Sequence, residues 1–472
     1  MSRPRIVILG AGPAGVGAAF ELTRKRNAEV TLLEQREVPG GNSGSFEVDG
    51  LRVDYGSHRL HPACDPKILA DLQEALGDDL LTRPRNGRIR LHGRWIGFPL
   101  RPADLALRLP KSFALRAAWD AVSKPLRRAP RIENFQTVLE RGLGPAICRG
   151  FYFPYARKIW GMEPDQLSAE QAKRRVSAGS PLKLLRKLAN AVPGLRAPNA
   201  NTFFYPRGGF GRISEALADA AQSVGARMLY GARVSGLEAR DGRVHTVHFE
   251  RDGSIEQIEA DHVWSTLPVT LAANILYPAA PAAVQAAASA MEFRAMLLIY
   301  LTLEADQFTP WDAHYFPEER IRITRLSEPK NYSASAEPAG RTVLCAELPC
   351  STEDAFWKMT DEELGREVQA DLERAGLPVR ANVSGVTVRR LRFAYPIYRD
   401  GFEAHFTLVD QWLSAFENFV SFGRQGLFAH DNTHHALAMA YAAVECLDQG
   451  GSFDRTRWAM WRGVFDSFVV ED

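Results

Sequence analysis

Apolar runs and a helical segment follow one another closely at the start of the chain. Residues 5–9 (RIVIL) are an apolar run ended by glycine, which is typical of a strand buried in a parallel sheet. Residues 16–26 have the pattern of a helix, and residues 30–33 (VTLL) form a second apolar run. A strand, a helix and another strand in this order predict a βαβ unit, and therefore an α/β fold.

Later segments predict further strands and helices. Residues 46–54 alternate around Asp49-Gly50 and residues 88–98 surround Gly93, so both segments predict β-hairpins. Residues 291–302 and 341–349 are apolar enough to be strands of a second sheet. Other strands are predicted at 226–229, 232–238, 244–249, 255–259, 261–268 and 419–422, and helices at 65–80, 208–224 and 434–446.

The pattern between residues 102 and 149 is helical and basic. Its cations include Lys111, Arg116, Lys124, Arg127, Arg128 and Arg131. We interpret this stretch as a solvated helical face, with a patch that contacts a membrane surface as the alternative. Residues 181–201 have the composition of a mobile loop after a short amphipathic helix, which predicts a lid.

The turn after the first strand carries a dinucleotide fingerprint. Gly10, Gly12 and Gly15 have the G-x-G-x-x-G spacing, and Glu34 ends the second strand. Gly10 permits the tight turn, Gly12 lets a pyrophosphate approach the backbone, and Gly15 lets the helix lie close to the strand. The helix N-terminus offers N–H groups to the phosphates, and Glu34 is placed for the adenosine ribose hydroxyls. The full context predicts a bound dinucleotide, although it does not separate NAD from FAD.

A second glycine pair follows the acidic residue. Gly40 and Gly41 precede Asn42, and residues 54–61 read DYGSHRLH. This opening resembles the FAD-binding segment of the superfamily of amine oxidases, protoporphyrinogen oxidases and UDP-galactopyranose mutases. The resemblance implies non-covalently bound FAD as the cofactor, held in a two-dinucleotide-binding Rossmann-like fold with an inserted substrate domain. That inserted domain would contain a mixed sheet and a helical region.

The resemblance also implies how the chain is divided. The expected parts are residues 1–64 (FAD-binding), 65–200 (helical substrate domain), 201–275 (FAD-binding), 276–415 (substrate-binding sheet) and 416–472 (FAD-binding). It places the backbone of Val234 at the adenine. It also places the helix that begins near His434 with its N-terminus toward the flavin. Gly41, Asn42, Gly423 and Arg424 are the other cofactor-binding residues that it implies.

Three segments of the substrate half resemble the mutase family. Phe151, Tyr155 and Trp160 lie in a segment whose aromatics pack a uridine in that family, and the alternative is that they are core aromatics. Arg174 and Arg325 match two arginines that bind the substrate diphosphate in the mutase family. This role is chemically reasonable, because a guanidinium group can donate two hydrogen bonds to phosphate oxygens. The alternatives are a solvated helix charge for Arg174 and a structural ion pair for Arg325.

The C-terminal segment departs from the mutase pattern. Phe428, His430 and Asp431 follow Gly423-Arg424 where that family has tyrosines that contact the phosphates and the sugar. This difference puts UDP-galactose in doubt as a substrate, but not the flavin.

Histidines are candidates for proton transfer rather than for metal binding. In the resembled fold, His58 and His61 follow a strand that points at the isoalloxazine, so His58 is the candidate proton carrier or hydrogen-bond donor. His430, His434 and His435 lack carboxylate or thiolate partners at metal-ligand spacing, and we expect no metal.

Composition limits the class of protein. A chain of 472 residues is too long for one ordinary core, and a net charge of +2 argues against a nucleic-acid partner. The five cysteines are odd in number and have no metal-binding spacing, which predicts free thiols in a reducing cytoplasm. No apolar stretch approaches the roughly 18 residues of a membrane span.

Three functional hypotheses follow from these residues. The first is a mutase-like enzyme acting on a nucleotide-diphosphate sugar, with NAD(P)H as a possible reductant of its flavin. The second is an oxidase or desaturase that transfers hydride from a small-molecule substrate to FAD. The third is a non-catalytic flavin-binding chaperone or scaffold.

Overall fold

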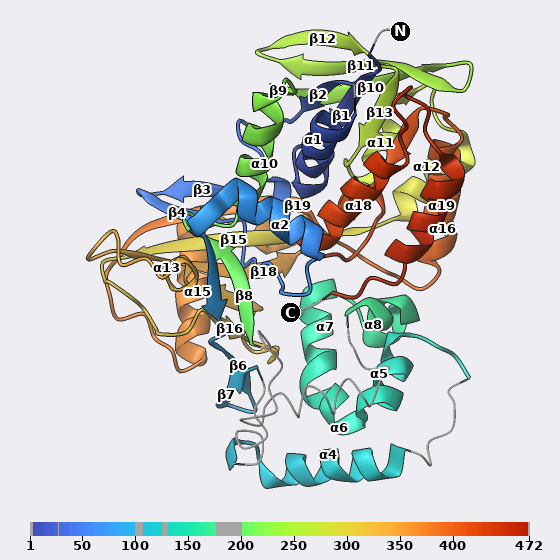
Figure 1. Ribbon diagram of the computed structural model, residues 1–472. Coiled ribbons are helices and arrows are strands. Elements are labelled where there is room, and N and C mark those ends of the chain that lie inside the picture. Colours follow the sequence, from blue (N-terminus) through green and yellow to red (C-terminus); the bar gives the residue numbers. More distant parts are fainter. Residues whose placement is uncertain (1–2, 27, 100–106, 125–130, 176–200, 471–472) are drawn as a thin grey trace.

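The computed structural model describes residues 3–26, 28–99, 107–124, 131–175 and 201–470. A nucleotide-binding fold lies at one end of the molecule, a large mixed sheet lies in the middle, and a group of helices lies at the other end (Figure 1). The predicted α/β class, with helices and several sheets, is confirmed.

The nucleotide-binding fold is built on a five-stranded parallel sheet. Its order is β20-β13-β1-β2-β9, and its pairings are all parallel. The strands are β1 (Arg5–Leu9), β2 (Glu29–Leu33), β9 (Arg227–Leu229), β13 (His262–Ser265) and β20 (Phe419–Ser421). They come from three distant parts of the chain, as the split cofactor fold implied by the resemblance requires.

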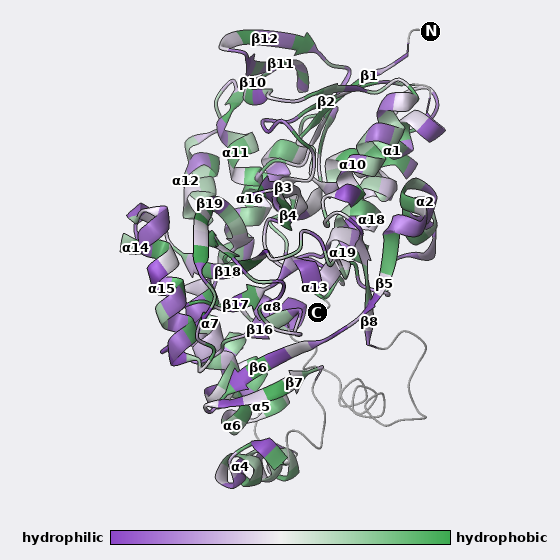
Figure 2. Ribbon diagram, turned by 90° about the vertical axis from the view of Figure 1, so that its left-hand side faces the viewer, coloured by the Kyte–Doolittle hydropathy of each residue, from purple (hydrophilic) through white to green (hydrophobic). Residues whose placement is uncertain are grey.

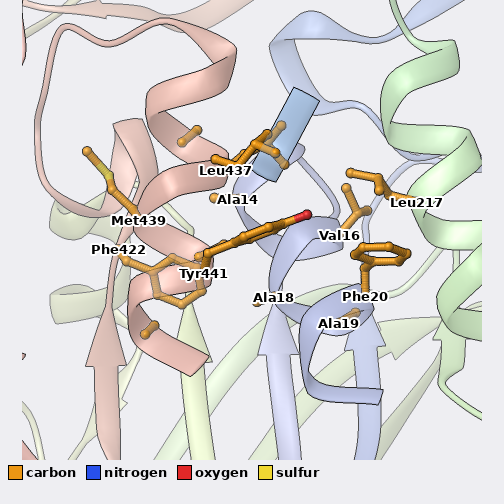
Figure 3. Packing of buried hydrophobic residues seen from close by; sticks show 14 of the residues in the cluster. Ala14, Val16, Ala18, Ala19, Phe20, Leu217, Phe422, Leu437, Met439 and Tyr441 are labelled. Carbon is orange, nitrogen blue, oxygen red and sulfur yellow. The ribbon is translucent and has the colours of Figure 1, made fainter. Parts of the chain in front are cut away.

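Three helices pack together over one face of this sheet. Helix α1 (Pro13–Lys25) lies between α10 (Arg212–Ser223) and α18 (Thr433–Glu445) (Figure 3). Val16 and Phe20 of α1 share a core with Leu217 of α10 and Leu437 of α18. A Cβ on Gly17 would lie only 2.8 Å from Cδ2 of Leu437, so a larger residue there would push this side chain aside.

A second core covers the opposite face. It joins the sheet to β10 (Arg233–Arg240), β11 (Arg243–Arg251), β12 (Ser254–Glu259), β14 (Leu276–Tyr277), α11 (Val269–Asn274), α12 (Ala282–Ala290) and α16 (Phe402–Ser414). Val284 of α12 and Val409 of α16 pack in the same cluster as Leu9 and Phe419. The division expected from the sequence assigns α12 and α16 to the substrate sheet. In the structure their apolar faces pack in this second core, against the nucleotide-binding fold.

The central sheet has seven strands. Its order is β19 (Val383–Pro396), β15 (Phe293–Leu303), β18 (Thr342–Cys350), β17 (Arg325–Ser327), β16 (Ala313–Tyr315), β6 (Gly87–Leu91) and β7 (Arg94–Phe98). The two apolar strands predicted near 291–302 and 341–349 are therefore confirmed as β15 and β18. Helix α15 (Asp361–Arg374) packs on one face of the sheet, and the hairpin of β3 (Ser45–Val48) and β4 (Leu51–Asp54) packs on the other.

The helical region follows the predicted pattern where the structure describes it. It contains α4 (Lys111–Ser123), α5 (Phe135–Leu143), α6 (Pro145–Ile147), the π-helical turn η4 (Cys148–Tyr152), α7 (Phe153–Trp160) and α8 (Ala169–Arg175). The candidate lid at 181–201 lies, apart from Asn201, outside the described residues.

Shorter elements complete the chain. They are η1 (Gly41–Ser43), α2 (Pro66–Leu76), η2 (Gly77–Asp79), β5 (Leu80–Pro84), η5 (Pro164–Gln166), β8 (Thr202–Pro206), α13 (Pro329–Ser333), α14 (Ala355–Lys358), α17 (Gly423–Gly426) and α19 (Arg455–Phe465). Polar and apolar residues are mixed along the outer helices (Figure 2). Of the helices that the structure describes, none is long and apolar enough to cross a bilayer.

Candidate active site

The three fingerprint glycines have different surroundings in the turn between β1 and α1. Gly10 has φ +96°, a left-handed conformation that favours glycine. A Cβ on Gly15 would lie 1.9 Å from the Gly10 carbonyl oxygen, so no larger residue fits there. Gly12, by contrast, has no heavy atom within 4 Å of a Cβ position. The side of Gly12 that a pyrophosphate would approach is thus open.

The N-terminus of α1 is free to receive an anion. Gly12 is its N-cap, no side chain caps it, and its first turn has no acidic residue. The first N–H groups of a helix have no partner within the helix, and its dipole favours negative charge there. This end of α1 is therefore suited to a phosphate.

The second glycine pair folds back onto the first turn. Gly41 has φ +53°, and a Cβ on it would lie 3.2 Å from Cα of Gly12. The N–H of Gly40 donates to the carbonyl oxygen of Ala11 at 2.8 Å. The two glycine turns are thus held together beside the open side of Gly12.

Glu34 lies buried at the carboxyl end of β2 and ties the two turns to the sheet. Its Oε2 accepts from the N–H of Ala11 at 2.8 Å, and its Oε1 accepts from the N–H of Arg36 at 2.9 Å. Arg36 in turn donates from Nη1 to the Gly41 carbonyl oxygen at 2.7 Å. The acidic residue is therefore fixed next to the turn where the ribose is expected.

The C-terminal segment closes the same site from the other side. Gly423 has φ +78°, and a Cβ on it would lie 2.7 Å from Cβ of Ala14 in the first turn of α1. Arg424 is half-buried, and its Nη2 donates to the Ala394 carbonyl oxygen at 3.0 Å. Asn42 donates from Nδ2 to the carbonyl oxygen of the neighbouring Phe393 at 2.9 Å.

Two other expected cofactor residues lie on elements of the nucleotide-binding fold. Val234 pairs with Phe249 at the start of β10, just before a β-bulge. His434 is buried in the first turn of α18, where its ring stands 6.4 Å from the ring of His61.

These features fit a bound dinucleotide. The open glycine turn and the uncapped helix lie at the carboxyl ends of parallel strands, where ligands bind in doubly wound folds. Among the described residues of the C-terminal segment, Nε of Arg424 and Oδ2 of Asp431 are buried without a hydrogen-bond partner, while Oδ1 of Asp431 lies 3.2 Å from Nδ1 of His435. Buried polar groups of this kind indicate a missing ligand.

His58 is held in a polar segment behind β4. Its Nε2 lies 2.9 Å from the Tyr55 carbonyl oxygen, and its ring stacks on Phe210 at 5.4 Å. Burial lowers the pKa of His58, although the nearby Asp54 carboxylate opposes this shift. Burial raises the pKa of Asp54, whose oxygens accept from Ser45, Tyr205 and the N–H of Phe210. The His58 imidazole is therefore neutral near pH 7.

An aromatic and cationic group, which we call the Tyr395 cluster, comprises Trp160, Arg175, Tyr395, Arg424 and His430. The guanidinium carbons of Arg175 and Arg424 stand 5.0 Å and 4.9 Å from the Tyr395 ring centre. The ring of Trp160 is steeply tilted to those of Tyr395 and His430, and the ring centres are 5.7 Å and 5.0 Å apart, respectively. Two residues predicted from the sequence, the substrate-binding candidate Trp160 and the cofactor-binding candidate Arg424, thus lie in the same cluster.

Arg174 has other partners. Its Nε donates to Glu170 at 2.8 Å, and its Nη2 donates to Asp466 at 3.0 Å. Arg175, the next residue of α8, stands over Trp160 at 5.3 Å. Successive residues of a helix project about 100° apart around its axis, so the side chains of Arg174 and Arg175 point in different directions.

Arg325 is engaged by a buried carboxylate. Its Nε and Nη2 donate to the two oxygens of Glu347, each at 2.8 Å. Glu347 also accepts from the N–H of Ser57 at 2.9 Å. Burial opposes the charge of Arg325, but Glu347 and the nearby tyrosines, including Tyr395 and Tyr155, raise the pKa of Arg325 well above its usual value.

Phe151 and Tyr155 stack on each other at 5.9 Å in η4 and α7. Phe151 also packs against the small core of Leu91, Ile96 and Leu109. They form an aromatic wall beside the central sheet, and Tyr155 lies within electrostatic range of Arg325.

His430 occupies the centre of the C-terminal segment. Its ring meets the Tyr398 ring at 4.7 Å. Burial lowers the pKa of His430 well below 6.5, and Arg175, Arg424 and Arg174 lower the pKa further. His430 is therefore a neutral imidazole among cations.

Sequence reasoning missed Arg175, Glu347, Tyr395 and Tyr398 as site residues. The run Phe393-Ala-Tyr-Pro-Ile-Tyr398 is a signal that could have found the two tyrosines, because it puts aromatics at the end of a long strand. Glu347 lies within an apolar strand, where a buried carboxylate needs a partner.

A dinucleotide cradle with a second glycine turn and a returning C-terminal segment defines a two-dinucleotide-binding flavoprotein. The chain belongs to the flavin containing amine oxidoreductase family, whose model matches residues 13–436. The protein is thus an FAD-dependent enzyme of this superfamily.

Relatives in sequence include oxidases. The chain is 30% identical over 281 residues to a putative flavin-containing monoamine oxidase, AofH, of Mycobacterium tuberculosis, a match that covers 56% of each protein. This match spans little more than half of AofH. The chain is 22% identical over 414 residues to the chloroplastic protoporphyrinogen oxidase of Oryza sativa, covering 78% of this chain and 74% of that protein.

Solved structures share the fold. Reduced UDP-galactopyranose mutase superposes with a TM-score of 0.77 at 23% identity, covering 94% of each chain. A putative protoporphyrinogen oxidase from Exiguobacterium superposes with a TM-score of 0.68 at 21% identity, covering 94% of this chain and 98% of that one.

Proposed function

We propose that the protein is an oxidase or desaturase that removes hydride from a C–H bond of an aromatic or unsaturated substrate carrying an acidic group. FAD, when bound, supplies the two-electron acceptor for this reaction. The glycine turns at Gly12 and Gly41 and the C-terminal Arg424 would hold it.

The observation that carries the proposal is that Arg325 and Arg174 are already paired with carboxylates of the protein. Arg325 gives both arms of its fork to Glu347, whose side chain is only 5% exposed. A diphosphate that displaced Glu347 would leave a buried carboxylate unpaired, and breaking such a pair costs about 3–5 kcal/mol. Arg174 is likewise placed between Glu170 and Asp466. This arrangement favours a substrate without a diphosphate.

The surroundings of Arg175 support the inference that the substrate carries an acidic group. Its Nε is buried, and no described residue accepts a hydrogen bond from it. The faces of Trp160 and Tyr395 lie beneath its guanidinium. A planar carboxylate could complete this site with charge-assisted bonds, while the aromatic rings contact an apolar or aromatic body.

His58 is our candidate for the proton that accompanies hydride removal. In the tautomer whose Nε2–H donates to the Tyr55 carbonyl oxygen, Nδ1 is the nitrogen that can accept a proton. Its lowered pKa keeps it in this form near neutral pH.

A mutase on a nucleotide-diphosphate sugar is the second candidate. The similarity of the whole chain to UDP-galactopyranose mutase favours it, as does the convergence of Arg175, Arg424 and Arg325 near Tyr395. In this case Arg174 and Arg325 would have to exchange their carboxylate partners for phosphates, and NAD(P)H would be the reductant.

Anaerobic mixing of the flavin-loaded protein with candidate substrates separates the two functions. Protoporphyrinogen and coproporphyrinogen, which carry carboxylates, are tested for bleaching of the oxidised flavin spectrum, with a primary amine that has no acidic group as the control. UDP-galactose is tested with oxidised and reduced protein. We expect bleaching by a compound of the first group and recovery of the spectrum when air is admitted. Isomerisation of a UDP-sugar by the reduced protein alone, with no bleaching by the others, would overturn the proposal.

A further inference from the structure

Helix α4 turns an apolar stripe toward solvent. Leu115, Trp119 and Val122 expose 71%, 71% and 74% of their surfaces, respectively, and no residue of α4 is buried. Spacings of four and three residues place them on one side of the helix. A helix that packs on a protein core normally hides such a stripe, so α4 carries its apolar side outward.

Contacts on the opposite side hold α4 in this orientation. Asp120 accepts at Oδ2 from the N–H of Ala146 at 2.7 Å. The Phe113 ring lies 4.7 Å from the ring of His92, and a Cβ on Gly150 would lie 2.6 Å from Phe113. Phe113 and Asp120 are seven residues apart and therefore face the same way. The exposed stripe is on the side away from these anchors.

The charges beside the stripe are positive. Lys111 and Arg116 are exposed, whereas Asp120, the only acidic residue of α4, faces the protein. Leu107 before the helix and Ile132 after it are also exposed, by 80% and 69%. Helix α4 lies at the extremity of the molecule opposite the nucleotide-binding fold (Figures 1 and 2). Nothing else in the described chain stands between it and a flat surface at that end.

We infer that α4 is an interfacial helix that docks the protein on an anionic lipid bilayer. Leu115, Trp119 and Val122 enter the boundary of headgroups and acyl chains, and Lys111 and Arg116 meet the anionic headgroups. A second copy of the chain matches this face less well, because a symmetric pairing of two such stripes brings like charges together. Docking of this kind needs no membrane-spanning helix.

Helix α4 lies close to the substrate side of the candidate active site, so docking through α4 would bring that side near the bilayer. Phe113 packs in the same small cluster as Phe151, part of the aromatic wall on the substrate side. The bilayer would therefore lie next to that wall. The inference itself rests on α4 alone and holds whichever reaction the flavin performs.

Co-sedimentation of the full-length, flavin-loaded protein with vesicles tests the inference. The vesicles contain phosphatidylcholine alone or phosphatidylcholine with phosphatidylglycerol. We expect binding to the mixed vesicles that weakens as salt is raised. The variant L115E/W119E should bind at least about tenfold more weakly, because burial of one large apolar side chain is worth that much or more. K111E/R116E should lose the preference for anionic lipid.

Ile255→Glu is the matched control, because Ile255 is 74% exposed on β12 at the other end of the molecule. It should bind as the parent does. Three results would overturn the inference: no binding of the parent to mixed vesicles, equal binding by L115E/W119E, or a dimer of the parent that L115E/W119E converts to a monomer. The flavin spectrum of each variant verifies that it is folded.

Discussion

The glycine turns and the Tyr395 cluster lie in the same protein but are built in opposite ways. At the turns, backbone meets backbone: a Cβ on Gly15 would strike the Gly10 carbonyl, and one on Gly41 would approach Cα of Gly12. At the Tyr395 cluster, side chains from α7, α8, β19 and the C-terminal segment converge. The first arrangement depends on the absence of side chains, and the second depends on their directions.

This difference has a chemical meaning. A cofactor common to a whole superfamily is met by backbone N–H groups, which every sequence with the right glycines supplies. A substrate is met by side chains, which can change while the fold is kept. The mutase-like backbone and the altered residues after Arg424 are therefore compatible with each other.

The largest expected effect separates two glycines of the same turn. Gly15→Ala should unfold the turn and abolish FAD binding, because its Cβ would lie 1.9 Å from a backbone oxygen that cannot move aside. Overpacking of this severity costs about 3 kcal/mol or more. Gly12→Val should also lose FAD but leave the apoprotein stable, because its side chain points into open space. The flavin-to-protein absorbance ratio and urea unfolding of both apoproteins measure this. Equal stability losses in the two variants would contradict the assignment of the open side.

The next effect concerns the ion pair on the substrate side. Glu347→Ala should lower the free energy of unfolding by about 3–5 kcal/mol, because it leaves the Arg325 charge buried without its carboxylate. The double variant E347M/R325M should regain most of that stability, since it removes both charges together. Urea unfolding of the three proteins provides the measurement. A fully stable Glu347→Ala protein would show that Arg325 is solvated, and would reopen its role as a phosphate ligand.

Arg174 and Arg175 provide a test within one helix. Arg175→Ala should weaken the binding of an aromatic carboxylate such as benzoate about 10- to 150-fold, the equivalent of roughly 1.5–3 kcal/mol for a charge-assisted bond. Arg175→Lys should restore part of this affinity. Arg174→Ala should leave benzoate affinity unchanged, because the Arg174 guanidinium is paired with Glu170 and Asp466. Titrations of the parent and the three variants with benzoate, followed by flavin absorbance, measure these affinities. A loss of affinity in the Arg174 variant alone would reverse the two assignments.

The smallest effect is a pH dependence at His430. Burial, together with the neighbouring arginines, places the pKa of folded His430 well below the 6.5 of the unfolded chain. The unfolded state therefore takes up a proton first as pH falls. The stability due to neutral His430 is complete above pH 6.5 and declines as the pH is lowered toward the folded pKa. His430→Gln should show a shallower decline of the melting temperature between pH 7 and pH 5 than the parent. Parallel curves would mean that His430 titrates normally.

The cofactor end was predictable because its signals are contiguous. Gly10, Gly12, Gly15 and Glu34 lie within one βαβ unit, and each has a physical role that depends on its residue type. The hairpin at Asp49-Gly50 and the strands β15 and β18 were predicted for the same reason, since alternation and apolar runs are local properties.

The substrate side was less predictable because its contacts are not local. Nothing in the order Lys173-Arg174-Arg175 tells which guanidinium meets Tyr395, 220 residues further along the chain. The sequence suggested that Arg325 could form a structural ion pair, but it did not identify Glu347 as the partner. The pairing of β6 with β16 joins segments that share no pattern of their own.

The contact between Gly423 and Ala14 also sets an order of events during synthesis of the chain. The first glycine turn leaves the ribosome early, but the strand β20 and the residues that close over α1 are made only after most of the other strands and helices. The nascent chain thus holds half of a cofactor site while most of the protein is still being translated. We expect FAD to be retained only after residues 419–445 have docked, so cofactor capture would report that this late segment has reached its place beside α1.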